Sequence, residues 1–395
     1  MKQPQLILID GSSYLYRAFY VPQLKRMQTA SGQPTGAVFG IVNMIKSLLT
    51  EYPESNVVAI FDAKGKNFRH ELFTDYKANR PSMPDELRSQ VEYVHRAVKA
   101  LGLPLVAMPG VEADDVIGTY AKLAGEAGQT VLVASGDKDL AQIVNEKVNL
   151  IDTMKKVILD EAGVVEKFGV RPDQIIDYLA LMGDTSDNIP GVPKVGPKTA
   201  VKWIAEYGSL DGVVENADKI GGKVGENLRE FLPQLPLSKD LVTIRCELDV
   251  DPKLADLKQT EQNKEELIEI YQTLQFKKLL TDLGADIVPG AVGGAARLDP
   301  RKRDDPVHHR RRRRVRLHAV QPAHHPGGGR HDRRAGGQPL GAARAGEPVP
   351  ARGGVLPAAG GGDPDGRPHP VADHHDGRVR SLLVRRGADD QHGDR

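Results

Sequence analysis

Cysteine is almost absent from the sequence, which has one such residue, Cys246, among 395. A single cysteine excludes an intramolecular disulfide framework and a cysteine-based zinc site, and it fits a reducing compartment. Long apolar runs are also missing, since none approaches the roughly 18 residues that a membrane-spanning helix needs. The N-terminal residues lead directly into a short strand, which is too short for a signal-peptide core. We therefore expect a soluble, cytoplasmic protein that has no membrane partner.

Aromatic residues make up only 5% of the chain, and none occurs after residue 290. That part is rich in Arg, Gly, His and Pro, includes the unbroken run Arg310–Arg314, and has no apolar periodicity. Such a composition cannot bury enough surface to offset chain entropy. Two interpretations are open: a disordered basic tail, or GC-rich coding sequence read out of frame. We favour the second and assign residues 289–395 no function.

Before that tail, strand-like and helix-like patterns alternate. Continuous apolar runs of strand length occupy residues 6–10, 57–61 and 130–134, with shorter ones at 148–152 and 157–160. Runs of this kind suit strands that are buried on both faces of a parallel sheet. Their alternation with helical patterns, such as residues 36–49, predicts an α/β fold with a mainly parallel sheet.

Acidic residues follow the ends of these strands. Three strands are followed by Asp10, by Asp62, and by Asp137 with Asp139, and a helix start after residues 103–107 carries Glu112, Asp114 and Asp115. One such acid is ordinary turn or helix-start chemistry, but several would converge on one edge of the sheet. Carboxylates crowded there repel unless cations are bound. Oxygen ligands indicate Mg²⁺ or Mn²⁺, and two such ions are a known device for phosphodiester cleavage.

A basic segment with interleaved aromatic residues lies between the second strand and the acidic helix start. Residues 63–80 contain Lys64, Lys66, Arg69, Lys77 and Arg80 together with Phe68, Phe73 and Tyr76. Cations and aromatic rings in this arrangement are typical of single-stranded nucleic acid sites, although a solvated helical surface is an equally good interpretation of the segment alone. Ser82–Asp85 resembles a capping box for a helix that runs to about residue 101.

The region after residue 160 has a helical pattern. A helix that starts near Pro172 is followed by Asp184 and Asp187, which a helical turn would aim in the same direction. The Gly191–Lys198 turn then joins two helices and lies near three lysines, which indicates phosphate binding without base reading. A plain helix–helix turn is the alternative. The turn is not a Walker A loop, because Pro follows its second glycine.

These motifs, in this order, closely resemble the 5′-nuclease domain of bacterial DNA polymerase I, within the wider flap endonuclease family. The resemblance rests on Leu8–Ala18, Phe61–Asp62, Tyr76–Pro81, Gly110–Asp115, Ser135–Asp139 and Gly183–Val192. It implies a PIN-like, Rossmann-like sheet with a helical arch in residues 1–170, and a helical DNA-binding region with a helix-hairpin-helix in residues 171–288. It also implies hydrolysis of 5′ ends and 5′ flaps during primer removal and repair.

The resemblance further implies roles for individual residues. Asp10, Asp62 and Asp114 would hold one Mg²⁺, and Glu112, Asp137, Asp139 and Asp184 the second, with Asp115 and Asp187 in support and Mn²⁺ able to substitute. Lys77, Arg80 and Arg17 would act on the scissile phosphate. The implied DNA contacts are Tyr14, Tyr76, Gly191, Lys194, Gly196, Lys198 and Lys202, with a K⁺ ion at the hairpin. The implied partner of a monomeric enzyme is DNA with a 5′ flap, nick or 5′ end, or an RNA primer–DNA hybrid.

The sequence departs from a full polymerase I after about residue 290, so we expect neither polymerase nor 3′ exonuclease activity. We expect a truncated or frameshifted product that keeps the nuclease domain. Two alternatives are a catalytically silent DNA-binding module and a PIN-type ribonuclease. The filled acidic positions count against the first, and the Gly191 hairpin together with Asp184 and Asp187 counts against the second.

Overall fold

The structure is a computed structural model that describes residues 3–285. The predictions for residues 289–395, and the last three residues of the predicted helical region, lie outside the described residues. Within residues 3–285, no helix combines the length and the apolar character that crossing a bilayer requires.

A six-stranded sheet forms the centre of the N-terminal half, with the strand order β3-β2-β1-β4-β5-β6. All neighbouring strands run parallel except β5 and β6, which are antiparallel. Strands β2 and β3 are added on one side of β1, and β4, β5 and β6 on the other. The direction in which the chain adds strands therefore reverses between β1 and β4. The strands are β1 (Leu6–Asp10), β2 (Asn56–Ile60), β3 (Leu105–Val106), β4 (Val131–Ala134), β5 (Val148–Asp152) and β6 (Val157–Leu159).

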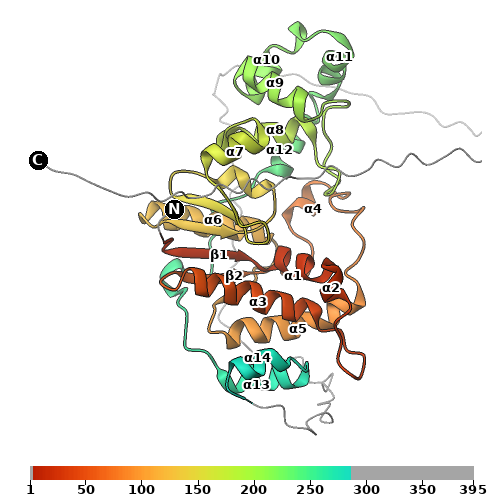
Figure 1. Cartoon of the computed structure of the whole chain (residues 1–395). Coiled ribbons are helices and arrows are strands. Elements are labelled where there is room, and N and C mark those ends of the chain that lie inside the picture. Colours follow the sequence, from red (N-terminus) through yellow and green to blue (C-terminus); the bar gives the residue numbers. More distant parts are fainter. Residues whose placement is uncertain (1–2, 286–395) are drawn as a thin grey trace, which may run out of the picture. The chain divides into compact units, whose positions relative to one another are not determined.

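Helices connect the strands and then make up the second half (Figure 1). The helices of the first half are α1 (Gly11–Tyr20), α2 (Pro22–Lys25), α3 (Gly36–Glu51), α4 (Phe68–Leu72), α5 (Asp85–Ala100), α6 (Ala113–Glu126), η1 (Asp139–Ile143) and α7 (Glu161–Phe168). Those of the second half are η2 (Pro172–Gln174), α8 (Ile175–Met182), α9 (Pro197–Tyr207), α10 (Leu210–Glu215), η3 (Ala217–Lys219), α11 (Gly222–Phe231), α12 (Leu235–Val242), η4 (Leu254–Asp256), α13 (Lys264–Thr273) and α14 (Lys277–Asp282).

The strands bury side chains on both faces, which explains their continuous apolar runs. Leu6 and Leu8 of β1 pack in one layer with α6, whereas Ile7 and Ile9 pack in the other with α1, α3 and α5. Figure 1 shows α1, α3 and α5 on one side of the sheet and α6 on the other. The three-layer arrangement confirms the predicted α/β fold.

The last helices return to the sheet domain after the helical region. Helix α13 contacts α5, and its buried Ile270 and Tyr271 join the same core layer as α3 and α5. Arg96 of α5 pairs with Glu266 at 2.7 Å. The last helices of the described chain therefore pack on the sheet domain and share its core.

Helix α5 also supplies the N-terminal cap of α3. Thr35 at the start of α3 makes no side-chain cap, and Oε1 of Gln90 instead accepts from the backbone N–H groups of Ala37 at 2.8 Å and Val38 at 3.4 Å. Gln90 is only 1% exposed. We call residues 63–84 the arch segment. Helix α5 follows this segment directly, so the cap fixes one end of it.

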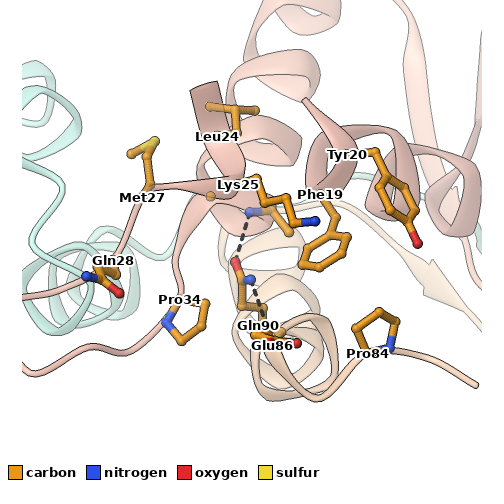
Figure 2. A pocket seen from close by; sticks show the side chains of 12 residues that line it. Phe19, Tyr20, Leu24, Lys25, Met27, Gln28, Pro34, Pro84, Glu86 and Gln90 are labelled. Carbon is orange, nitrogen blue, oxygen red and sulfur yellow. Dashed lines mark hydrogen bonds between the residues drawn. The ribbon is translucent and has the colours of Figure 1, made fainter. Parts of the chain in front are cut away.

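A hollow of about 290 Å³ lies beside this contact and is lined by residues of α1, α2 and the start of α5 (Figure 2). Its walls include Phe19, Tyr20, Lys25 and Pro84, and none of the acids that follow the strands. It is therefore separate from the acidic edge of the sheet.

Replacing Gln90 with alanine should lower the free energy of unfolding by about 1–3 kcal/mol, because two buried N–H groups lose their acceptor. Chemical denaturation measures this change. The matched control is Gln262→Ala, at an exposed position, which should change stability little. Equal losses in both variants would contradict a capping role for Gln90.

Two local predictions were wrong. The N-cap of α5 is Pro84, with no side-chain cap, so the Ser82–Asp85 capping box does not form. Asp184 and Asp187 lie not on a helical turn but in a loop that is closed by a β-bridge between Asp184 and Ile189. In this bridge the backbone N–H and C=O groups of Asp184 both pair with Ile189, at 3.0 and 2.7 Å, so the backbone does not continue as a helix.

Candidate active site

The ends of three neighbouring strands place acidic side chains together. Asp10 ends β1, Asp62 follows β2, and Asp137 and Asp139 follow β4. Strands β2, β1 and β4 are adjacent in the sheet, and the reversal of strand order beside β1 is the position where open α/β sheets bind ligands. The hydroxyl of Ser135 donates to Asp10 Oδ2 at 2.7 Å and joins the two strand ends at that reversal.

Helix α6 brings Asp114 into the same group. The backbone N–H of Ala113, in the first turn of α6, donates to Asp62 Oδ1 at 2.9 Å, which docks the helix start against the end of β2. The pKa of Asp114 is raised well above its ordinary value by burial and by the negative charges of Asp137, Asp10 and Asp62. We call Asp10, Asp62, Asp114, Asp137 and Asp139 the acidic cluster.

Two other members of the acidic cluster also ionise with difficulty. Burial, with smaller contributions from Asp62 and Asp137, raises the pKa of Asp10 to about 7. Burial and the charge of Asp137 raise the pKa of Asp139 to about 8. These shifts show that the carboxylates are crowded and poorly compensated by the protein's own cations.

Asp184 lies next to this cluster but is paired with a cation. Its carboxylate is 2.8 Å from Nζ of Lys138. Burial alone would raise the pKa of Asp184, but the contact with Lys138 outweighs it and the pKa is lowered. The sequence did not single out Lys138, although its place between Asp137 and Asp139 was a signal.

Glu112, which immediately precedes α6, anchors the arch segment. Its carboxylate accepts from Asn67 Nδ2 at 2.7 Å, from the Tyr76 hydroxyl at 3.0 Å and from Nζ of Lys77. Burial would raise the pKa of Glu112, but Lys77 and Arg69 outweigh it and hold the pKa below its ordinary value. The ionised carboxylate thus binds three side chains of the arch segment.

Asp187 anchors the arch segment from the other side. It forms ion pairs with Arg80 and, at 3.5 Å, with Lys77, and the backbone N–H of Lys77 donates to its carbonyl oxygen at 2.8 Å. Lys77 adopts a left-handed backbone conformation with φ of 56°, which costs a residue with a Cβ atom about 1–2 kcal/mol. Contacts with Glu112 and Asp187 hold Lys77 in place, and Arg80 lines a cleft together with Asp137 and Asp139.

Arg69 and Asp115 form a fully buried ion pair, and Arg69 also lies 3.4 Å from the Glu112 carboxylate. The Arg69 guanidinium donates to both Asp115 oxygens, at 2.7 and 2.8 Å, and also to the carbonyl oxygens of Leu241 and Thr243. The exposed fractions of Arg69 and Asp115 are 2% and 0%. The pair links the arch segment, α6 and the chain that follows α12.

Four sequence-based expectations are corrected by these contacts. Asp115 does not join the acidic cluster, because Arg69 occupies both of its oxygens, and Arg69 is a buried anchor instead of a nucleic acid contact. Tyr14 is 0% exposed and its hydroxyl pairs with Thr153. Tyr76 is 3% exposed and donates to Glu112. Neither tyrosine presents a surface to DNA, because each faces the interior from its helix or turn.

The Gly191 hairpin joins α8 to α9 as expected. A Cβ atom at Gly191 would lie 2.2 Å from the backbone of Met182, so only glycine permits the close approach. Gly196 is the N-cap of α9, and Lys194, Lys198 and Lys202 are exposed beside it. The N–H groups of Thr199 and Ala200 donate to the Gly196 carbonyl oxygen, each at 3.0 Å, so the cations of these three lysines are the groups that make this surface suited to phosphate.

A cleft of about 510 Å³ joins several of these groups. Its walls are Ser13, Arg17, Arg80, Gly136, Asp137, Lys138, Asp139, Asp152, Lys155, Asp184, Ser186 and Asp187. The sequence analysis assigned no role to Asp152 or Lys155, although Asp152 ends a strand in the same way as Asp10.

The donor set of the acidic cluster suits a hard divalent cation. Within residues 3–285, no three His, Cys, Asp or Glu side chains are placed closely enough to hold a metal ion by themselves. The donors of the acidic cluster are nevertheless all carboxylate oxygens, and burial and mutual repulsion raise the pKa values of Asp10, Asp114 and Asp139, which a divalent ion would relieve. The residues therefore fit such an ion.

Comparison with known families gives two consecutive matches. Residues 5–169 match the family described as 5′-3′ exonuclease, N-terminal resolvase-like domain, and residues 170–265 match 5′-3′ exonuclease, C-terminal SAM fold. A solved structure of T5 5′-exonuclease with bound zinc is 24% identical, with a TM-score of 0.52, and covers 70% of this chain and 97% of that one. These matches confirm the PIN-like sheet followed by a helical region.

Curated relatives show the same family. DNA polymerase I of Pseudomonas aeruginosa is 50% identical over 304 residues, which are 75% of this chain and 33% of that protein. The chain thus spans about a third of the length of this polymerase. A 5′-3′ exonuclease of Aquifex aeolicus is 38% identical over 278 residues, which cover 70% of this chain and 94% of that protein. On this similarity, together with the two family matches, the chain belongs to the 5′-3′ exonuclease family and is a nuclease.

Proposed function

We propose that this nuclease hydrolyses phosphodiester bonds of DNA at 5′ ends, nicks and 5′ flaps, including RNA primer–DNA hybrids, with two divalent metal ions. The observation that carries the proposal is the convergence of Asp10, Asp62, Asp114, Asp137 and Asp139 at one sheet edge, with raised pKa values at three of them. The T5 D15 flap endonuclease, which shares the fold, has been solved in a pseudo-enzyme–product complex with DNA and metal ions. We further propose that the chain acts as a monomer in the cytoplasm during primer removal and repair.

Ligand roles follow from which carboxylates are crowded and which are already paired. Asp10, Asp62 and Asp114 would hold one Mg²⁺, or Mn²⁺ in its place, and Asp137 and Asp139 the second. Asp184 would join the second ion after Lys138 leaves it, because their 2.8 Å ion pair now occupies the carboxylate. Glu112 and Asp187 act on the ions indirectly, since Lys77, Tyr76 and Arg80 hold them.

The bound ions would activate the attacking water and neutralise the charge that develops on the phosphate. The chain's own residues position the substrate. Lys77 and Arg80, fixed by Glu112 and Asp187, present cations above the acidic cluster, and Arg17 presents one from α1 in the same cleft. Preorganised donors near a developing negative charge stabilise the transition state more than the ground state.

We propose two functional parts. Residues 1–170 form the catalytic core with the arch segment, and residues 171–288 form the DNA-binding region. The Gly191–Lys198 hairpin would hold duplex phosphates through a K⁺ ion and through Lys194, Lys198 and Lys202. These contacts read the backbone and carry no base specificity.

The test is single-turnover cleavage of a 5′-flap DNA, with Mg²⁺ and with EDTA, by the full chain and by residues 1–288. Mg²⁺-dependent cutting near the flap junction is the expected result. Tight binding without cutting would favour a catalytically silent DNA-binding module. Faster cutting of a matched RNA flap would favour a PIN-type ribonuclease, which does not require the Gly191 hairpin.

Lys77→Ala should slow the chemical step about 100-fold and weaken DNA binding much less, because its cation acts mainly on the transition state. Single-turnover rates and equilibrium binding measure the two effects separately. Lys99→Ala, at an exposed site on α5, removes an equal charge away from the cleft and serves as the control. Equal losses of rate and affinity in Lys77→Ala would count against a transition-state role.

A further inference from the structure

The side chain of Arg17 crosses the acidic edge of the sheet. Arg17 belongs to α1, which follows β1, yet its Nη2 donates to Asp152 Oδ1 at the end of β5, 2.6 Å away. Strand β4 lies between β1 and β5. The guanidinium group must therefore pass over the carboxyl end of β4.

Gly136 lies at this crossing. A Cβ atom added to Gly136 would be 2.5 Å from Nη1 and 2.9 Å from Cζ of Arg17. Gly136 does not have a positive φ angle, so backbone conformation does not explain the glycine. The passage of the Arg17 guanidinium explains it, because any larger residue would displace that group.

Asp152 is itself held in place for this contact. Its Oδ1 accepts from the backbone N–H groups of Met154 at 3.1 Å and Lys155 at 3.3 Å. Burial opposes ionisation, but Arg17 and the N–H groups of Lys155 and Met154 together outweigh it and hold the pKa of Asp152 below its ordinary value. The Tyr14 hydroxyl, one helical turn before Arg17, pairs with Thr153 at 2.8 Å. Helix α1 is therefore fixed to the β5–β6 turn at two points.

The Arg17 guanidinium keeps donor capacity after this pairing. Nη1 is buried and has no hydrogen-bond partner among residues 3–285, while the side chain as a whole is 23% exposed and lines the cleft with Asp137 and Asp139. A guanidinium with one nitrogen fixed and another unpaired is suited to a phosphate oxygen, which accepts strong charge-assisted bonds.

We infer that Gly136 and Asp152 are positioning residues for Arg17: Gly136 leaves room for the guanidinium across the end of β4, and Asp152 fixes its far side so that it meets a substrate phosphate beside the acidic cluster. This inference rests on the proposed DNA cleavage. It extends the site to two residues that act through Arg17.

The test is a mutant cycle in the full chain. Gly136→Ala and Asp152→Asn are each made with Arg17 present and with Arg17→Ala, and Asp152→Glu tests conservative rescue. Gly125→Ala, where the nearest atom to a new Cβ is 3.8 Å away, and Asp173→Asn, which removes an exposed ion pair with Arg171, are the controls. Gly136→Ala meets only the flexible end of Arg17, so the chain should still fold.

Gly136→Ala and Asp152→Asn should each lower the single-turnover rate on saturating flap DNA about 10- to 100-fold, the usual effect of a small misplacement of a reacting group. Melting temperatures should match those of the controls. With Arg17→Ala, neither substitution should lower the rate further, and Asp152→Glu should recover part of it. Equal losses with and without Arg17, losses that follow the melting temperature, or full activity of Arg17→Ala would overturn the inference.

A second measurement separates this inference from the proposed function. The ¹⁵N NMR signal of the Arg17 Nε–H group should shift in Gly136→Ala and Asp152→Asn and stay in place in both controls. If the wild-type chain cuts no DNA but the Arg17 signal still shifts in the two variants, only the proposed function is contradicted. Unchanged signals would overturn the positioning of Arg17 whether or not the enzyme cuts.

Discussion

Asp114→Asn should lower the rate of flap cleavage by about 100- to 1,000-fold while leaving DNA affinity nearly unchanged. Asp114 lies in the acidic cluster at the start of α6, and its replacement removes one carboxylate that would hold a metal ion. Loss of one preorganised group that stabilises transition-state charge typically costs about 100- to 1,000-fold in rate. The lysines of the Gly191 hairpin are not altered, so binding should persist. Single-turnover cleavage and equilibrium binding on the same flap DNA measure both quantities.

The same substitution should raise the melting temperature in EDTA. Burial and the charges of Asp137, Asp10 and Asp62 raise the pKa of Asp114, so its ionised form destabilises the folded state at pH values above the ordinary pKa of an aspartate. A neutral amide of the same shape removes that repulsion. Asp85→Asn, whose side chain is 96% exposed, is the control. A lower melting temperature, or parallel losses of rate and affinity, would contradict the place of Asp114 in the cluster.

Arg69→Met should lower the free energy of unfolding by about 3–5 kcal/mol, because it leaves the Asp115 carboxylate buried without its cation. It also removes the donors to the carbonyl oxygens of Leu241 and Thr243. The arch segment, α6 and the chain after α12 would all lose a shared anchor. Urea denaturation, monitored by circular dichroism, measures the change.

Arg96→Met is the matched control, because Arg96 pairs with Glu266 and Glu269 in a partly exposed setting. Pairs of this kind contribute about 0–1 kcal/mol. Combining Arg69→Met with Asp115→Leu should cost less than the sum of the single changes, since no unpaired charge remains. Unchanged stability with weaker DNA binding in Arg69→Met would instead support the surface role that the sequence suggested.

The strands and the acids that follow them could be predicted because both are local properties. A continuous apolar run such as Leu6–Ile9 predicts a strand buried on both faces, and parallel strands bring their carboxyl ends to one edge. The positions of Asp10, Asp62 and Asp137 follow from that rule alone. The Gly191 hairpin could be predicted in the same way, because its glycines, proline and lysines are close in sequence.

The partners of each charged group could not be predicted in this way. Glu112 and Asp115 are three residues apart in one acidic motif, yet Glu112 pairs mainly with Lys77 and Asp115 with Arg69. Arg69 was one of several cations in a basic segment, and burial alone separates it from the exposed Lys64 and Lys66. Glu112 is the extended residue before α6 and Asp115 lies in its first turn, and the elements that pack there decide what each one meets.

The sequence by itself determined that there is a mainly parallel sheet and that acidic residues follow its strands. It also determined the basic arch segment and the nuclease family. Tertiary structure alone decided which charges meet. Arg17 reaches Asp152 across 135 residues of sequence, and Arg69 reaches Asp115 across 46. The physical reason is that apolar periodicity and turn chemistry act over a few residues. The pairing of buried charges, in contrast, depends on distances that exist only once the strands and helices have packed.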